Sequence, residues 1–579
     1  MNCDDLAAHD RRSKNIDRLR SSAILIPYIV GSLLVLTGLL VPSSLLLGLL
    51  RATPAQPDFL KQLLPGIVLF KGGLVILGLA IALTGRTALW TPNRLKQERA
   101  DQPVPMFDAV VLGAILLVSA ALTLYRLDDG LWFDEIVTYA NYVRKPIGEI
   151  ITTYETQNQH VLYSILAHAF LQIFGDSVWA LRLPAAIFGL GSVGALYLFG
   201  RQVTSSKEAL FAAALLAFSY HHVWFSQNAR GYTGLVFWTL MSSWFFVRAL
   251  REGRPILWVL YAFSAALGAY TLVYIFFVIV AHFVVYLMTL FSRGEEAWTS
   301  RLTGLILGFC LAGFLTFQLY ALVLPQVLTA FETVAVVGQV WTHPFWAILE
   351  FVRGMRLNFS GSFVGIAALL VFSAGLWSYA RSNFTVVALL VLPVFVCVAV
   401  KWGMGHHLWP RSFIFAVGFG ALVVVRGAMS LGDLFTRLLR LRFATPQLAG
   451  NALCAGLILV SAVSVPYAFG PKQDYIGAMN FVQTTQEPGD SVVTVGLASF
   501  AYKRFYKTNW DEAASLEALN AIRSRSKRTW LIYTLPIQLQ DAQPGIMASA
   551  ERDFKIVKRF PGTLGGGDIF IRRADLPPA

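Results

Sequence analysis

The sequence predicts a polytopic α-helical membrane protein with about thirteen transmembrane helices and a small soluble α/β domain at its C-terminal end. Hydrophobic residues make up 56% of the 579 residues and charged residues only 14%, whereas soluble chains carry roughly 25% charged residues. Apolar runs near the ~20 residues that cross a bilayer as a helix recur along the chain. After residue 470 polar residues return, and no window is apolar enough to cross a bilayer.

The predicted spans begin with a long N-terminal run and include one ambiguous segment. The run 22–48 follows a basic stretch, but it is too long for the apolar part of a signal peptide, so we expect a retained helix. The segment 161–174 is short and suits an interfacial or re-entrant helix better than a full span. The thirteen predicted spans are 22–48, 64–84, 107–125, 179–200, 208–226, 231–250, 255–270, 272–291, 302–324, 363–380, 384–400, 411–428 and 449–469.

The distribution of lysine and arginine predicts the orientation. If 161–174 does not cross, the basic loops, among them 11–20, 86–99 and 437–442, all fall on one side. Cytoplasmic loops carry such an excess, so we expect a bacterial inner-membrane protein with a cytoplasmic N-terminus and a periplasmic C-terminal domain. The net charge of +14 then needs no nucleic-acid partner. The four cysteines indicate neither a disulfide framework nor a zinc site.

These boundaries divide the chain into four parts. Residues 1–106 hold a cytoplasmic tail and an extra helix pair, and 107–324 form a core membrane module whose first outer loop is 126–178. Residues 325–470 hold a second outer loop and the remaining membrane helices, and 471–579 form the soluble domain. Long loops among tight connections are usually functional or disordered, so we expect a site on the outer face.

The C-terminal part alternates strand-like and helix-like stretches, which is typical of an α/β domain. It has neither a glycine-rich phosphate loop between a strand and a helix nor histidines and cysteines at metal-ligand spacing. The strand-like runs are 491–495, 529–534, 554–560 and 568–572, and the helix-like stretches are 474–485, 511–525 and 537–552.

Two adjacent carboxylates, Asp134 and Glu135, follow the third predicted span in the stretch Leu127–Glu135. Ionisable groups at a membrane helix end are costly near hydrocarbon, so they suggest a functional site. A solvated acidic loop is the simpler alternative.

Further polar residues fall at the outer ends of predicted spans. Any single basic residue there has the simpler explanation of reaching toward lipid head groups. Together, however, guanidinium groups suit a phosphate, and a carboxylate beside an acceptor hydroxyl suits a general base. The candidate donor-phosphate or substrate-binding residues are His160, Tyr163, Arg182, Gln227, Arg230, Tyr232, Lys401, His407 and Arg411.

This pattern predicts group transfer from a lipid-phosphate donor at the membrane surface. A transporter or lipid flippase is the main alternative, but it would place ionisable residues at mid-membrane, at broken helices related by a repeat. A ligase that joins whole lipid-linked glycans shares the same architecture.

Four short motifs in order resemble those of the GT-C superfamily of membrane glycosyltransferases, and most closely bacterial relatives of protein O-mannosyltransferases and of the lipid A aminoarabinose transferase. The motifs are Trp132-Phe133-Asp134-Glu135, Gln159-His160-Val161-Leu162-Tyr163, Ala180-Leu181-Arg182-Leu183-Pro184 and Ser226-Gln227-Asn228-Ala229-Arg230-Gly231-Tyr232. The resemblance implies a GT-C fold and an inverting transfer of a sugar from a polyprenyl-phosphate donor to a lipid, glycan or protein acceptor on the periplasmic face.

The resemblance also implies residue roles. Asp134 matches the family's first-loop catalytic acid, and Glu135 beside it positions the acceptor or a metal. Arg230 and Arg411 match arginines near the donor phosphate. A divalent metal at Glu135 and His160 is left open, because two ligands are too few to assign one.

Two departures leave the acceptor and the metal dependence open. Val161-Leu162 replaces the proline pair that usually follows the histidine, and the acid that some members carry after the arginine turn is absent. The sequence names neither the sugar nor the acceptor.

Overall fold

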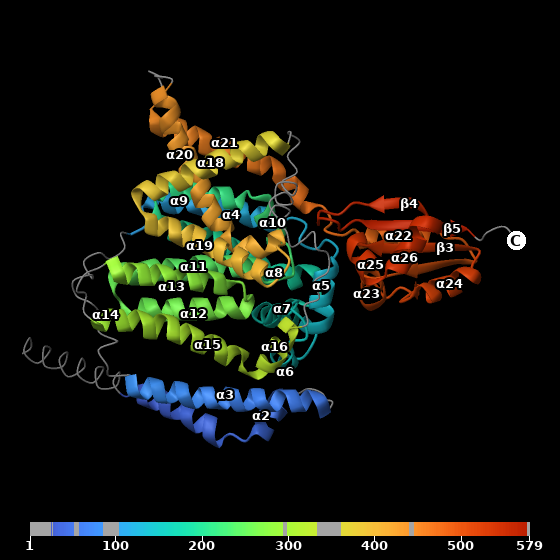
Figure 1. Cartoon of the computed structure of the whole chain (residues 1–579), viewed down its shortest axis with the longest axis horizontal. Helices are drawn as coiled ribbons and strands as arrows, with labels where there is room; N and C mark the ends of the chain where they lie inside the picture. Colours follow the sequence, from blue (N-terminus) through green and yellow to red (C-terminus); the bar gives the residue numbers. More distant parts are fainter. Residues whose placement is uncertain are drawn as a thin grey trace, which may run out of the picture.

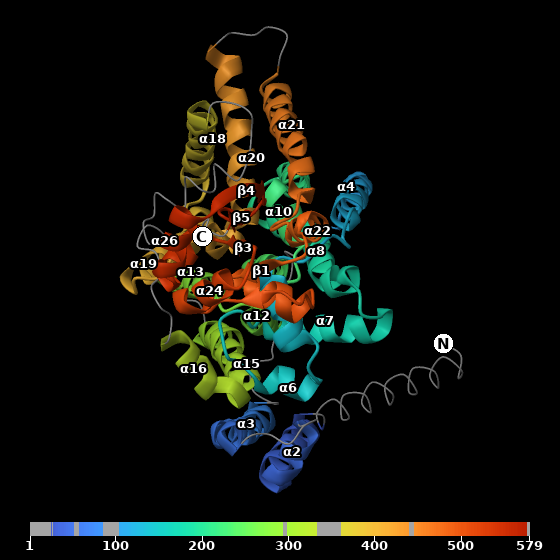
Figure 2. The same cartoon turned by 90° about the vertical axis from the view of Figure 1, so that its right-hand side faces the viewer.

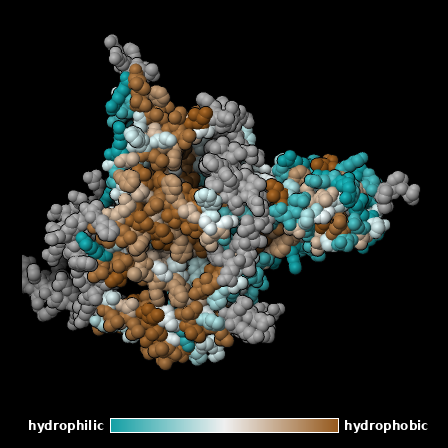
Figure 3. Space-filling view, viewed as in Figure 1, coloured by the Kyte–Doolittle hydropathy of each residue, from teal (hydrophilic) through white to brown (hydrophobic). Residues whose placement is uncertain are grey.

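The computed structural model describes residues 25, 27–50, 57–84, 103–292, 298–332, 361–438 and 445–575. Within this part of the chain, eight helices are long and apolar enough to cross a membrane, or ten if each of two bent pairs is one span. Figure 1 shows these helices as one body with a separate sheet domain at its right-hand end. Hydrophobic surface covers the helical body, and hydrophilic surface dominates the sheet domain (Figure 3). The chain is therefore a polytopic helical membrane protein with a C-terminal sheet region.

The count of thirteen spans is not confirmed. Each predicted run corresponds to a helix or a bent pair, but α12 (Pro255–Thr271) and α13 (Ile275–Ser292) fall among the shorter apolar helices. The segment 161–174 forms α7 (Val161–Phe174), which is also one of the shorter helices. The basic stretches 11–20 and 86–99 lie outside the described residues.

The N-terminal helices form a separate layer against the rest of the body. Pro27–Leu40 and α2 (Ser43–Leu50) meet at 94°, so the predicted helix 22–48 is broken into two helices rather than continuous. Pro42 separates the two helices, because proline lacks the N–H and disrupts a helix at its preceding turn. Next, α3 (Pro57–Thr84) packs Leu63 and Ile67 against Leu322, and Figure 1 shows α2 and α3 along one edge.

The first outer loop is folded rather than irregular. After α4 (Met106–Leu124), it forms α5 (Phe133–Thr138), the π-helical turn η3 (Tyr139–Val143) and α6 (Ile147–Thr152) before α7. Leu131, Ile136 and Val143 of this loop share one buried cluster with Ala478 and Tyr502 of the C-terminal domain. The loop is therefore held between the helical body and that domain.

A second bent pair changes the predicted span 208–226. The helices α9 (Ser206–Ala217) and α10 (Tyr220–Ser226) meet at 61°. Ser219 begins α10 because its hydroxyl accepts a hydrogen bond from the His222 amide. The bend turns α10 across the end of the helical body, where its side chains meet the C-terminal domain. Next to this pair lie α8 (Val178–Val203) and α11 (Tyr232–Glu252).

The remaining membrane elements complete the body. They are α14 (Trp298–Thr303), η4 (Gly304–Cys310), α15 (Leu311–Tyr320), η5 (Ala321–Val323), α16 (Leu324–Glu332), α18 (Gly361–Ser382), α19 (Phe384–Gly403), η7 (Pro410–Ala416), α20 (Val417–Leu438), α21 (Pro446–Ser464) and η8 (Val465–Phe469). Most of the predicted outer loop in 325–362 lies outside the described residues. In both Figure 1 and Figure 2, α18, α20 and α21 stand together at one edge.

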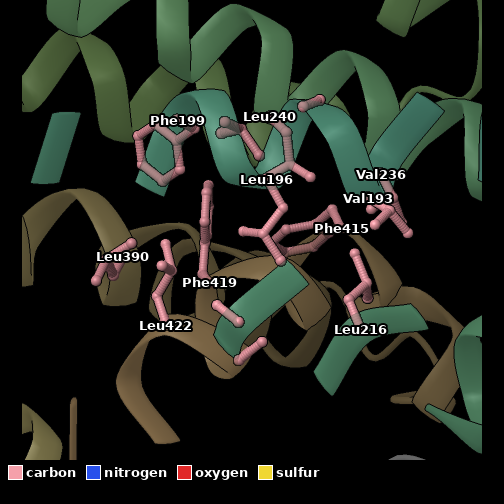
Figure 4. Close-up of a cluster of buried hydrophobic side chains, with 14 of the residues drawn as sticks. Val193, Leu196, Phe199, Leu216, Val236, Leu240, Leu390, Phe415, Phe419 and Leu422 are labelled. Atoms are coloured by element: carbon pink, nitrogen blue, oxygen red, sulfur yellow. The ribbon is translucent and has the colours of Figure 1, made fainter. Parts of the chain in front are cut away.

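The core of the body lies where α8, α11 and α20 meet. Figure 4 shows Leu196 and Phe199 facing Phe415, Phe419 and Leu422, and the Phe199 and Phe419 ring centroids are 5.6 Å apart. In a membrane such close packing, rather than transfer from water, holds helices together. This core fixes η7, the short helix that carries Arg411.

The C-terminal domain is a five-stranded sheet in the order β2-β1-β3-β5-β4. Strands β1 (Asp490–Thr494), β3 (Arg528–Thr534), β4 (Lys555–Phe560) and β5 (Ile569–Asp575) confirm the four predicted strands. The short β2 (Asp511–Glu512) was not predicted. It occupies the start of the predicted helix 511–525, so the helix, α24 (Leu516–Ser524), begins only after its N-cap residue Ser515. The β1 strand pairs in parallel with β2 and β3, whereas β5 runs antiparallel to β3 and β4.

The helices of this domain cover the sheet. Helix α22 (Tyr475–Thr485) confirms the predicted helix 474–485. The predicted helix 537–552 is instead two helices, α25 (Pro536–Ala542) and α26 (Pro544–Asp553), because Pro544 starts a new one. The short α23 (Leu497–Phe500) and η9 (Ala501–Phe505) follow β1.

Candidate active site

Asp134 lies in the first turn of α5, where its carboxylate meets Arg411 from η7. The Arg411 Nη1 donates to Asp134 Oδ2 at 3.0 Å, and 18% of the Asp134 side chain is exposed. Residues 277 positions apart in the sequence are therefore brought together. The Thr138 hydroxyl and the Asn158 amide donate to the Asp134 backbone carbonyl at 2.8 and 3.4 Å.

Asp134 and Arg411 open onto a cavity of about 400 Å³ between the helical body and the C-terminal domain, called here the seam cavity. The helical body contributes residues 132–134, Tyr220, His221, Trp224, Phe225, Tyr232 and residues 409–411 to its lining. The C-terminal domain contributes Gln473, Leu497, Leu535, Gln538 and the segment 563–565. A cavity of this size is within the range of small-ligand sites.

Glu135, the next residue, is fully buried and faces the other way. Arg182 donates two hydrogen bonds to its carboxylate, from Nε at 2.8 Å and from Nη2 at 2.6 Å. The Ala229 amide adds a third at 2.6 Å. Arg182 also donates to the carbonyls of Leu127, Asp129 and Gly130. The pair therefore ties the first loop to α8 and to the turn before α11.

The charge of Glu135 is stabilised despite burial. Burial by itself raises its pKa, but the Arg182 charge and hydrogen bonds, with help from Lys472 and the Ala229 amide, outweigh it and hold the pKa below its usual value. A buried ion pair that is fully hydrogen-bonded fixes geometry more than it adds stability.

Arg230 and His160 lie behind Asp134. The Arg230 guanidinium donates to the Thr138 hydroxyl at 3.1 Å and to the Asn158 carbonyl at 3.0 Å, and it lies 3.2 Å from His160 Nε2. The Gly231 amide donates to His160 Nδ1 at 2.8 Å. Burial, together with the Arg230 and Arg411 charges, holds the pKa of His160 well below its usual value, so the imidazole is neutral.

Three other predicted site residues occupy different places. The Tyr163 hydroxyl is buried and donates to the Leu181 carbonyl at 2.6 Å. The Gln227 side chain caps the end of α4 by donating to the Thr123 carbonyl at 3.0 Å. Tyr232 lines the seam cavity, with its ring 5.5 Å from that of His160. Of the three, only Tyr232 reaches the seam cavity.

Lys401 lies beside a second, apolar cavity of about 510 Å³ that runs between α13, α15 and α19. Its ammonium donates to the Tyr274 hydroxyl at 3.3 Å and to the Ser412 hydroxyl at 3.1 Å. Ser412 follows Arg411, so this cation is adjacent to the Asp134–Arg411 pair. The predicted His407 packs its ring 6.5 Å from that of Trp409.

Lys472 and Gln473 were missed by the sequence analysis. They follow the last membrane helix, where no motif marks them. The Gln473 amide joins the two halves, because its oxygen accepts from the Phe133 amide at 2.9 Å and its nitrogen donates to the Thr534 hydroxyl at 2.9 Å. The buried Lys472 donates to the Gln227 carbonyl at 2.9 Å. Burial lowers the pKa of Lys472 to about 7, opposed by the Glu135 charge and reinforced by that of Arg182.

A divalent metal does not fit the predicted pair Glu135 and His160. Both oxygens of Glu135 accept hydrogen bonds from Arg182, and both nitrogens of His160 face N–H groups. No group of three or more histidine, cysteine, aspartate or glutamate residues is arranged to hold a metal in the part of the chain that was described.

Comparisons with known proteins agree with the motif resemblance. Residues 159–320 match the family model described as dolichyl-phosphate-mannose-protein mannosyltransferase. Two proposed mannosyltransferases of Bacillus subtilis (strain 168) are similar: YkcB is 27% identical over 168 residues and YycA 33% identical over 95 residues. The matches cover 27% and 16% of this chain, and 22% and 14% of the relatives' own lengths. The resemblance to the GT-C membrane glycosyltransferases is confirmed over this central region.

Solved structures with a similar arrangement include two GT-C proteins. The apo crystal structure of ArnT from Cupriavidus metallidurans aligns with a TM-score of 0.46 at 12% identity, over 80% of this chain and 97% of that one. The apo oligosaccharyltransferase of Archaeoglobus fulgidus aligns with a TM-score of 0.47 at 13% identity, over 80% of this chain and 74% of that one.

Proposed function

We propose that this chain is an inverting glycosyltransferase that moves a sugar from a polyprenyl-phosphate donor to an acceptor hydroxyl at the periplasmic surface of its membrane. The observation that carries the proposal is the Asp134–Arg411 pair at the wall of the seam cavity, 3.0 Å apart and partly exposed. Three of the four motifs lie within residues 159–320, which match the mannosyltransferase family model, and the motif that carries Asp134 precedes this region.

The apolar second cavity suits the donor lipid. Its lining is mostly hydrocarbon and aromatic, and it includes Lys401, Tyr274 and His406. An isoprenoid tail lies among apolar side chains, and its phosphate takes Lys401 and Arg411, since cations stabilise developing charge on a leaving phosphate. Arg411 is bound to Asp134 in this structure, so donor binding divides its hydrogen bonds between the carboxylate and the phosphate.

The reaction needs a base and a leaving-group site on opposite sides of the anomeric carbon. The acceptor oxygen forms a bond to that carbon, its proton passes to the Asp134 carboxylate, and the carbon–oxygen bond to phosphate breaks. The electron pair leaves with the polyprenyl phosphate, and the anomeric configuration inverts. A positioned carboxylate of this kind contributes about a hundredfold to ten-thousandfold.

The buried groups hold this geometry. Glu135 and Arg182 fix the loop that carries Asp134, and Arg230 with His160 fixes the turn before α11. In this proposal Glu135 positions Asp134 rather than touching substrate. Tyr163 and Gln227 act in the same way through the carbonyls that they bind, and His407 supports Trp409.

The proposal places the seam cavity and the C-terminal domain on the periplasmic side of a bacterial inner membrane, with the N-terminus in the cytoplasm. The charge distribution of the loops supports this orientation. Sugar, acceptor and donor are then all reached from one surface.

The proposal is tested with the purified protein in nanodiscs and a set of polyprenyl-phosphate sugars, beginning with mannose because the matched family model is named for it. We expect release of polyprenyl phosphate and a product of inverted anomeric configuration. If none of the donors binds or is cleaved, whatever acceptor is present, the proposal is wrong.

A further inference from the structure

The seam cavity is built jointly by the two halves of the chain, and each half fixes it through the other. The Trp224 indole nitrogen of α10 donates to the Thr563 hydroxyl of the C-terminal domain at 2.8 Å. The Lys472 ammonium donates to the Gln227 carbonyl of the helical body at 2.9 Å, and Gln473 bridges Phe133 and Thr534. The cavity is therefore a formed site rather than a gap between two loosely joined parts.

The lining is aromatic and carries no surplus charge. Among the described residues that line it, Asp134 and Arg411 are the only acidic, lysine or arginine side chains, and they pair with each other. Each has an aromatic neighbour in the same lining, Phe133 and Trp409, and both rings are partly exposed. The Trp409 ring lies 5.3 Å from the Arg411 guanidinium, so it is held beside the reacting groups.

Hydrogen-bonding groups stand on the opposite wall. Gln538 of α25 lines the cavity, and its side chain makes no hydrogen bond to any described residue. A side-chain amide offers two donors and an acceptor. The Thr563 hydroxyl accepts from Trp224 and keeps its own proton for a ligand. Flat aromatic faces on one side and neutral amide and hydroxyl groups on the other suit a ring that is apolar on its face and hydroxylated at its edge.

We infer that the seam cavity is the acceptor site and that the acceptor is an uncharged saccharide, whose ring packs on Phe133 and Trp409 and whose hydroxyls bind Gln538 and Thr563. The inference rests on the proposed function and names its acceptor class. A sugar ring presents C–H groups to the electron-rich face of an aromatic ring and exchanges hydrogen bonds at its rim.

Two other acceptor classes fit the lining less well. A phosphorylated lipid head group needs a cation of its own, but the one arginine of the lining is shared between Asp134 and, in the proposed function, the donor phosphate. A peptide needs a partner for the N–H and C=O of each residue, and Gln538 and Thr563 supply too few for an extended chain. A neutral saccharide leaves no charge unpaired.

In this arrangement a hydroxyl of the acceptor ring is the nucleophile. Its oxygen bonds to the anomeric carbon of the donor, its proton passes to Asp134, and polyprenyl phosphate departs with the bonding electrons. The C-terminal domain then selects the acceptor, because Gln538 and Thr563 belong to it.

The test is saturation-transfer NMR on the full chain in nanodiscs, with methyl α-mannopyranoside as the probe and the linear polyol sorbitol as the comparison. Gln538→Trp fills the cavity from the C-terminal side. Ile537→Trp is the matched control, because Ile537 is the preceding residue of α25 and is 54% exposed outside the lining. Gln538→Ala removes only the amide, and the melting temperature of each variant checks folding.

We expect saturation to be transferred from the protein to the methyl mannoside but not to sorbitol. Gln538→Trp is expected to weaken the affinity for the methyl mannoside about tenfold, and Ile537→Trp is expected to leave it unchanged. Equal binding to the Gln538→Trp and Ile537→Trp variants overturns the inference. Sugar transfer to a peptide or a charged lipid with no saccharide binding also overturns it, while the proposed function survives. Saccharide binding at the cavity in a protein that cleaves no polyprenyl-phosphate sugar supports the saccharide site and contradicts the proposed transferase.

Discussion

Asp134 and Glu135 are adjacent acids with opposite surroundings. Asp134 is partly exposed and pairs with one arginine at the wall of a cavity, whereas Glu135 is fully buried and receives hydrogen bonds from Arg182 and from the Ala229 amide. Because successive side chains of α5 point in different directions, one acid faces the seam cavity and the other faces the core. The first has room for a substrate, and the second does not.

This difference separates two roles that the sequence places side by side. A partly exposed carboxylate can exchange its arginine for a substrate proton, which is what a general base requires. A saturated buried carboxylate fixes the backbone around it. We therefore assign catalysis to Asp134 and positioning to Glu135, and the predictions below test that division.

The largest expected effect is the loss of transfer in Asp134→Asn. An amide cannot take the acceptor proton, so turnover is expected to fall by about a hundredfold to ten-thousandfold, with an unchanged melting temperature. Initial rates of polyprenyl phosphate release measure this. Turnover near that of the unmodified protein excludes Asp134 as the base.

Glu135→Gln is expected to reduce stability rather than only activity. It leaves Arg182 buried without its charge partner, a change that costs about 3–5 kcal/mol, so the melting temperature in nanodiscs falls. The double variant Glu135→Gln/Arg182→Met removes the stranded charge and recovers much of the loss. If Glu135→Gln keeps normal stability but loses turnover, Glu135 takes part in catalysis, and the division of roles between Asp134 and Glu135 is wrong.

A smaller effect is expected on donor binding. Lys401→Met removes one cation next to the apolar cavity, which weakens polyprenyl phosphate binding by about tenfold, or 1.4 kcal/mol. Arg411→Ala is expected to act in the same direction. Lys503→Met is the control, because Lys503 is exposed on the C-terminal domain. Titration of the lipid into nanodiscs gives the affinities, and equal values for Lys401→Met and Lys503→Met contradict this placement of the phosphate.

Gln473→Leu is expected to slow turnover modestly. It removes the hydrogen bonds to Phe133 and Thr534, each of which contributes about 1 kcal/mol, and so loosens the first turn of α5. The expected result is a lower kcat with an unchanged KM for the donor, and Gln473→Glu, which keeps the acceptor for the Phe133 amide, recovers part of the rate. If kcat is unaltered in Gln473→Leu, the contact of the C-terminal domain with α5 does not contribute to catalysis.

The remaining prediction concerns stability and pH at Lys472, whose pKa is lowered by burial to about 7 from 10.5. Between these values the unfolded chain keeps a proton that the folded chain has released, so the folded state gains stability as pH rises from 7 toward 10.5. Lys472→Met lacks this contribution. As pH rises across this window, the free energy of unfolding of the unmodified protein is expected to increase relative to that of Lys472→Met by at most about 1.4 kcal/mol per pH unit. The difference between the two melting temperatures follows this change. Parallel pH curves contradict the assignment.

The sequence predicted the membrane class, the alternating C-terminal domain and a gathering of polar residues at outer helix ends, but not the direct pair of Asp134 with Arg411. Composition and motif order carry those features, because they depend on local runs of residues. The bends before Pro42 and at Ser219 were missed, since apolar runs continue through both. The role of Glu135, the capping role of Gln227 and the bridge at Gln473 were also out of reach, because each depends on contacts between distant segments.

The most direct test of the central claim is a density map of the protein in nanodiscs with added polyprenyl phosphate. We predict a lipid in the apolar cavity between α13, α15 and α19, with its phosphate in contact with Lys401 or Arg411 and with Asp134 facing the seam cavity. The Glu135–Arg182 pair is expected to remain intact. A phosphate bound elsewhere, or a lipid that displaces Arg182 from Glu135, contradicts the division between a catalytic and a positioning acid.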